Sequence, residues 1–148
     1  MVPQLKYIRT PIIIKEILFI EKTNNGDIIM NMELLKKLLN CDISWKDFSS
    51  IEKCNSYLIK WKGVIIKVDR NIVKKAIQSC LDDKFTMQDL LDWSNVVRFS
   101  DVFSVEENCR ECVVSILDRI EESDEEGNAL CKNDLLLMLN KLDNNEEW

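Results

Sequence analysis

Apolar residues recur every three or four positions through the second half of the chain, the spacing of one face of a helix. Asp69 or Asn71 can cap the first stripe, and Thr86 with Asp89 resembles a capping box at the start of the second. The first stripe consists of Ile72, Val73, Ala76, Ile77, Cys80 and Leu81, and the second of Leu90, Leu91, Trp93, Val96 and Val97. The third helix is expected to start at about Ser104, and its apolar residues are Cys109, Cys112, Val113, Ile116, Leu117 and Ile120. The fourth is expected to start at about Lys132, and its apolar residues are Leu135, Leu136, Met138, Leu139 and Leu142. These stripes predict a helical bundle over residues 69–142.

The first 68 residues contain two hairpin signals. Asn25-Gly26 lies between two apolar runs and favours a hairpin over the alternative, a helix that starts after Thr10-Pro11. Lys62-Gly63 likewise separates two runs rich in β-formers, 57–61 and 64–68, and predicts a second hairpin.

Short helices are expected between these hairpins. Four leucines at residues 34, 35, 38 and 39 form one apolar stripe that Asn31 can cap, and the polar stretch 45–56 is compatible with another short helix. Only three glycines and two prolines occur, too few for the many turns of a β-sandwich or barrel. We predict a mainly α fold, a C-terminal helical bundle with a smaller N-terminal part containing short β-hairpins; α+β is the alternative.

The length of 148 residues fits one domain, because a chain of this size can bury a sizeable core. We expect a single domain over 1–148, made of a mixed part (1–68), the bundle (69–142) and a frayed tail (143–148). The most apolar run, residues 12–20, is too short to span a membrane, and its two charges argue against a signal peptide. A cytoplasmic location is therefore expected.

The chain contains no histidine, which removes imidazole-based catalysis and imidazole zinc ligands. Six cysteines are present, and Cys109 and Cys112 have the C-x-x-C spacing. A four-cysteine zinc site needs a second close pair, and Cys41 and Cys54 are too far apart to supply it. A thioredoxin-type motif opens a helix after a strand, whereas we expect this pair inside a helix. The prediction is reduced, buried cysteines, with no catalytic residue, metal site or cofactor.

Charge is distributed unevenly along the chain. Residues 1–100 carry 16 Lys/Arg and 12 Asp/Glu, and residues 101–148 carry 4 and 14, so the two parts are formally +4 and −10, in agreement with the net −6. The lysine-rich stretch 60–75 could face nucleic acid, but the acidic balance opposes phosphate binding. A solvated edge strand explains the lysines better, and no nucleic-acid or membrane partner is expected.

The densest charge is the run at residues 121–126, which contains five carboxylates. These candidate partner-binding residues are Glu121, Glu122, Asp124, Glu125 and Glu126. An acidic surface speeds association with a basic protein, although the same run could be only a solvated loop between two helices. Trp45 and Trp148 lie in polar surroundings and are the expected exposed aromatic contacts.

Residues 68–77 and 84–95 resemble a helix–turn–helix signature of small bacterial immunity proteins, which protect against toxins such as those of contact-dependent growth inhibition. Thr86, Asp89, Leu90, Trp93 and Asn95 match this signature, and Ser94 replaces its alanine. The resemblance covers about residues 68–142. We interpret Leu90 and Trp93 as core residues, and Asp89 and Asn95 as residues at helix ends.

The resemblance implies a non-catalytic protein that binds one toxin domain, often a nuclease, and masks its active site. The expected partner is a cognate, basic toxin domain; the oligomeric state is left open. The alternative is a non-catalytic interaction module of housekeeping or phage origin. A carboxylate-based enzyme is a third and weaker hypothesis.

Overall fold

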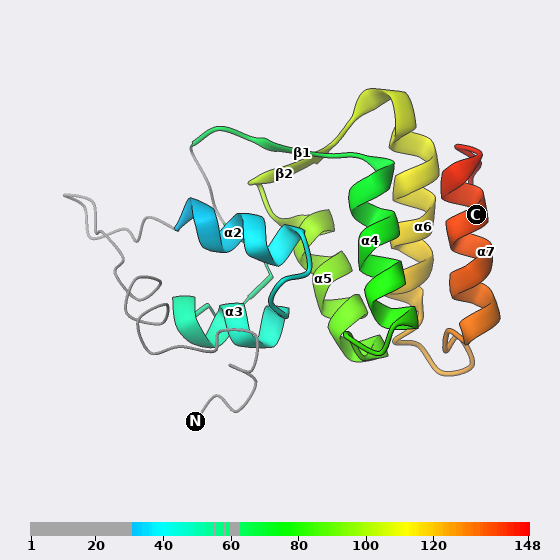
Figure 1. The fold of residues 1–148 in the computed structure, drawn as a ribbon, viewed down its shortest axis with the longest axis horizontal. Helices are drawn as coiled ribbons and strands as arrows, with labels where there is room; N and C mark the ends of the chain where they lie inside the picture. Colours follow the sequence, from blue (N-terminus) through cyan, green and yellow to red (C-terminus); the bar gives the residue numbers. More distant parts are fainter. Residues whose placement is uncertain (1–30, 55, 58, 60–62) are drawn as a thin grey trace. The chain divides into compact units, whose positions relative to one another are not determined.

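The computed structural model describes residues 31–148 except 55, 58 and 60–62 (Figure 1). Contacts within the chain cluster into two units, Met1–Asn55 and Ser56–Trp148, and each is described by itself. The hairpin predicted around Asn25-Gly26 lies outside the described residues.

The first unit contains two short helices that pack together, α2 (Met32–Leu39) and α3 (Trp45–Glu52). Asn31 caps α2 as predicted, because its side chain accepts a hydrogen bond from the Leu34 N–H at 3.1 Å. The Trp45 ring stacks on Phe48 with 5.5 Å between ring centroids and is only 8% exposed. The prediction that Trp45 is an exposed contact was therefore wrong, since its aromatic neighbour one helical turn away keeps it inside.

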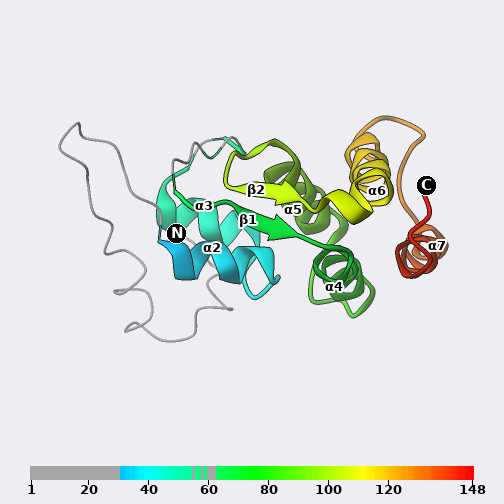
Figure 2. The same ribbon diagram turned by 90° about the horizontal axis from the view of Figure 1, so that it is seen from above.

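The second unit is dominated by four helices: α4 (Arg70–Leu81), α5 (Met87–Phe99), α6 (Arg110–Glu122) and α7 (Lys132–Asp143). Helix α4 contacts α5 and α7, and α6 also contacts α5 and α7, so the four close into a ring. Figure 2 looks along α4, α6 and α7 nearly end-on. The mainly α prediction is confirmed. None of the helices in the described residues has the length and apolar content that crossing a bilayer requires.

Local capping explains where the helices of the second unit begin. The Asp69 carboxylate accepts from the Ile72 N–H at 2.9 Å and starts α4. Thr86 and Asp89 form the predicted capping box, with both reciprocal bonds at 3.0 Å. Asn95, in contrast, lies in the middle of α5 and not at a helix end, because α5 continues to Phe99.

Two short strands, β1 (Ile66–Val68) and β2 (Phe103–Val105), form a parallel pair with Ile66 opposite Phe103. The strand that pairs with β1 among the described residues is therefore one that follows two helices later, whereas the hairpin predicted around Lys62-Gly63 needed a partner that precedes β1. That predicted partner, 57–61, lies partly outside the described residues. A parallel pair needs a long crossover, which α4 and α5 provide here.

The start of α6 also differs from the prediction. The apolar stripe suggested a helix from about Ser104, but this residue belongs to β2, and a 3-10 turn (Glu107–Cys109) precedes α6. Phe103 and Val105 alternate with Ser104 and bury their side chains, so strand pairing replaces the first helical turn. The C-x-x-C motif consequently spans the start of a helix that follows a strand.

The residues after α7 are held by hydrogen bonds, although the sequence suggested a frayed tail. The Asn145 side chain donates to the Asn108 carbonyl at 3.1 Å, and the Trp148 N–H donates to Ser115 Oγ at 2.9 Å. The end of α7 is held as well, because the Arg70 guanidinium donates to the Leu142 carbonyl at 2.9 Å. The tail therefore packs along the start of α6.

Asp83 has a left-handed backbone (φ 59) just after the C-cap of α4, Asp82. Glycine adopts this conformation without the steric cost of a Cβ, so Asp83→Gly should raise the free energy of unfolding by about 0.5–1 kcal/mol. Urea unfolding followed by far-UV circular dichroism measures the change. Asp82→Gly is the matched control: Asp82 has φ −85, so this substitution should not stabilise the protein. Equal effects of the two substitutions would contradict the prediction.

Candidate functional site

The five predicted binding residues lie at the junction of α6 and α7. Glu121 and Glu122 are the last two residues of α6, and Asp124, Glu125 and Glu126 follow in the turn. All five are exposed. This turn and the strand pair lie at opposite ends of the four-helix ring (Figure 1).

Four of these carboxylates border a shallow hollow of about 550 Å³, here called the acidic hollow. Its lining residues are Tyr57, Leu91, Asn95, Phe99, Asp118, Glu121, Glu122, Asp124 and Glu125. Glu126 is not part of this lining, so the structure brings together four of the five predicted residues. A charge run that is continuous in sequence thus becomes one wall of a concave surface.

Helix α5 supplies the opposite wall of the acidic hollow. Leu91, Asn95 and Phe99 are four residues apart, so they share one face of α5. The Phe99 ring is 41% exposed, and Asn95 Oδ1 is buried without a hydrogen-bond partner. The hollow therefore combines negative charge with an exposed aromatic surface and an unsatisfied acceptor.

Tyr57 is held at the acidic hollow by hydrogen bonds to the body of the unit. Its hydroxyl donates to Asp92 Oδ1 at 2.7 Å, and its carbonyl accepts from the Ser100 hydroxyl. Burial raises the pKa of Tyr57 to about 12, and the hydrogen bond and charge of Asp92 add to this rise. Tyr57 is therefore neutral near pH 7 and serves as an aromatic wall and hydroxyl, not as a base.

Four of the five carboxylates that line the acidic hollow are not neutralised by nearby basic residues; the exception is Asp118. Arg98 pairs with Asp118 at 3.1 Å, on the rim of the hollow. Arg119 donates to the Asn128 carbonyl at 2.9 Å. Among the described residues, no lysine or arginine forms an ion pair with Glu121, Glu122, Asp124 or Glu125. The negative charge of this wall therefore faces solvent.

Several residues of the acidic hollow were missed by the sequence analysis. The spacing of Leu91, Asn95 and Phe99 was a usable signal, but Asn95 was interpreted as a helix end. Tyr57 had no local signal, because its partner Asp92 is 35 residues away. Within the described part of the chain, no group of three or more cysteine or acidic side chains is placed to hold a metal ion.

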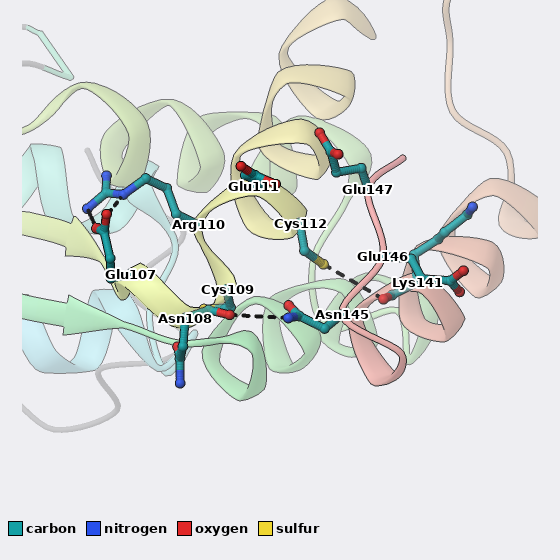
Figure 3. A pocket seen from close by; sticks show the side chains of 10 residues that line it. All are labelled: Glu107, Asn108, Cys109, Arg110, Glu111, Cys112, Lys141, Asn145, Glu146 and Glu147. Carbon is teal, nitrogen blue, oxygen red and sulfur yellow. Dashed lines mark hydrogen bonds and ion pairs between the residues drawn. The ribbon is translucent and has the colours of Figure 1, made fainter.

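A second hollow of about 490 Å³ lies at the start of α6 (Figure 3). It is lined by both cysteines of the C-x-x-C motif and by the residues after α7. Its charges are mixed: Arg110 and Glu107 are paired at 2.9 Å, and Lys141 also borders it. The second hollow is therefore less suited than the acidic hollow to select a partner by charge.

No protein-family model, curated protein or solved structure matches this chain. The assignment of the site therefore depends on the geometry and charge of the residues described above. These features favour a surface that binds a positively charged partner.

Proposed function

We propose that this chain is an immunity protein that acts in the cytoplasm by binding a basic toxin domain, such as a nuclease, and masking its active site. The observation that carries the proposal is the acidic hollow, where four carboxylates that form no ion pair with any described lysine or arginine adjoin the exposed Phe99 ring. The likeness of residues 68–142 to small immunity proteins supports a toxin as the partner.

The two kinds of side chain in the acidic hollow would act at different stages of binding. Carboxylates attract a basic surface over a Debye length, about 8–10 Å at ordinary ionic strength, and so mainly raise the association rate. Phe99 would contribute apolar contact, and a cation–π contact with a basic side chain of the partner, after docking. An inhibitory interface of standard size buries about 800 Å² on each partner, so the hollow would be its centre and not its whole extent.

Removal of four carboxylates tests this proposal. The variant Glu121→Gln, Glu122→Gln, Asp124→Asn and Glu125→Gln should associate at least about 10-fold more slowly with the cognate toxin domain at low salt. Its association rate should also depend less on salt. Stopped-flow or biosensor kinetics at several salt concentrations measure both effects, and rescue of growth on co-expression measures protection.

The matched control removes the same charge elsewhere. Glu33→Gln, Glu111→Gln, Glu146→Gln and Glu147→Gln also take the formal net charge from −6 to −2, and all four side chains are exposed. This variant should associate at nearly the native rate if the acidic hollow is the docking site. Equal slowing in the two variants would assign the effect to net charge, and unchanged association in both would overturn the proposal.

A further inference from the structure

The two cysteines of the C-x-x-C motif lie at the start of α6: Cys109 is the last residue of the 3-10 turn that follows β2, and Cys112 is in α6. Cys109 is the N-cap residue of α6, and Cys112 lies three positions on, in the first helical turn. Both border the second hollow (Figure 3), although their side chains are only 4% and 2% exposed. A cysteine pair that opens a helix after a strand has the placement of dithiol redox motifs.

The spacing of these positions is compatible with a direct bond between the sulfurs. Cβ atoms three residues apart on a helix are about 5–6 Å from each other, whereas a disulfide needs about 3.5–4.5 Å, so closure requires the two positions to approach by roughly 1–2 Å. Cys109 precedes the first helical residue and has a non-helical backbone (φ −133, ψ 13), which is where such a shift can occur. Both thiols are free: the Cys109 thiol donates to the Glu106 carbonyl at 3.6 Å, and the Cys112 thiol donates to the Lys141 carbonyl at 3.7 Å. A rotation about each Cα–Cβ bond, together with a small backbone shift at the start of α6, would exchange these weak bonds for the covalent one.

The surroundings of the pair decide how fast it can react. Burial raises the pKa of both thiols, which lowers the thiolate fraction at neutral pH. The positive charge of Arg70 lowers the pKa of both thiols, and a hydrogen bond with the Arg70 backbone also lowers the pKa of Cys109. The Arg70 guanidinium is held in place by the Leu142 carbonyl. Oxidation should therefore be slow compared with that of an exposed, activated cysteine.

We propose that Cys109 and Cys112 form a reversible intramolecular disulfide, which makes the start of α6 responsive to a peroxide. One thiol loses its proton, the thiolate attacks hydrogen peroxide, and the O–O bond breaks to give a sulfenic acid and hydroxide, which takes up that proton and becomes water. The second thiol then displaces the sulfenic hydroxyl, which leaves as a second water. Two thiols and one peroxide thus give one disulfide and two waters, and an external dithiol reverses the reaction.

Formation of this disulfide would also change the contact between α6 and α7. The Cys112 thiol donates to the carbonyl of Lys141, in the last turn of α7, and the disulfide has no hydrogen to donate. Figure 3 shows this contact beside the bond from Asn145 to the backbone at Asn108. The segment after α7 is therefore where an effect of oxidation should first be measurable, for example as faster amide exchange. This inference does not depend on a toxin partner.

The chain offers a direct test, because Arg110 lies between the two cysteines. After treatment of the reduced protein with hydrogen peroxide and alkylation of free thiols, trypsin should release peptides 99–110 and 111–119 as one linked species. Dithiothreitol should separate them, and the intact protein should have lost about 2 Da on oxidation. Cys109→Ser and Cys112→Ser should each abolish the linked species.

The exposed Cys131 supplies the control, because Cys131→Ser should leave the yield of the linked species unchanged. Absence of the species at peroxide concentrations that fully oxidise free dithiothreitol would overturn the proposal. The same conclusion would follow if Cys109 and Cys112 were instead alkylated in full, or linked mainly to other cysteines.

Discussion

We expect Trp93→Ala to lower the free energy of unfolding by about 3–5 kcal/mol, the usual cost of replacing a buried aromatic residue with alanine. The Trp93 side chain is fully buried on α5, which contacts both α4 and α6. The substitution therefore removes apolar contacts and leaves a cavity that the surrounding helices can fill only in part. Because small proteins are stable by about 5–15 kcal/mol, the variant should be marginally folded.

Urea unfolding followed by far-UV circular dichroism measures this loss without depending on tryptophan fluorescence. Phe99→Ala is the matched control, since it removes an aromatic ring from the same helix at a position that is 41% exposed. We expect it to cost less than about 1 kcal/mol. A loss at Trp93 no larger than that at Phe99 would show that Trp93 is not central to the packing of the helices. Phe99→Ala should instead weaken binding of the toxin domain, if the acidic hollow is the docking site.

We expect Glu52→Gln to stabilise the protein at pH 8 by about 2 kcal/mol and to have almost no effect at pH 4. The Glu52 side chain is 2% exposed at the end of α3. Burial raises the pKa of Glu52 from 4.5 to about 7, and the nearby Asn31 backbone opposes this rise only in part; neither carboxylate oxygen has a hydrogen-bond partner among the described residues. An acid at a helix C-terminus also faces the negative end of the helix dipole.

The direction in which the stability changes with pH follows from proton binding to Glu52. Between pH 4.5 and 7 the folded protein keeps the Glu52 proton while the unfolded chain has lost it, so stability falls as pH rises through this window. Above pH 7 the carboxylate is charged in both states and the full cost of its burial remains. Glutamine carries no charge at any pH, so the variant should lack this part of the decline.

Unfolding free energies at pH 4, 6 and 8 test the expected difference. Glu33→Gln is the control, because Glu33 is an exposed glutamate in the same unit. Its effect should be small and should change little with pH. If native protein and Glu52→Gln lose stability in parallel from pH 4 to 8, Glu52 is not the group responsible.

Much of the helical architecture could be predicted from sequence because the determining contacts are local. The Asp69 cap and the Thr86–Asp89 capping box each join residues three apart, and the apolar stripes report which helix faces are buried. The match of Leu90 and Trp93 to core positions follows from the same periodicity. For these caps and buried faces, residues close together in the sequence are sufficient to determine the local structure.

The strand pair and the candidate site depended on contacts that no short window contains. The three residues of β2 could equally begin the helical stripe of α6, and only pairing with β1 across two intervening helices makes them a strand. A hydrogen bond to Asp92 holds Tyr57 at the acidic hollow. Asn95 borders the hollow from within α5, which continues to Phe99. Sequence alone thus determined most of the helices, the caps of α2, α4 and α5, and the acidic run. The tertiary structure decided that this run borders a hollow with an aromatic wall, because long-range packing places residues that are far apart in the chain side by side.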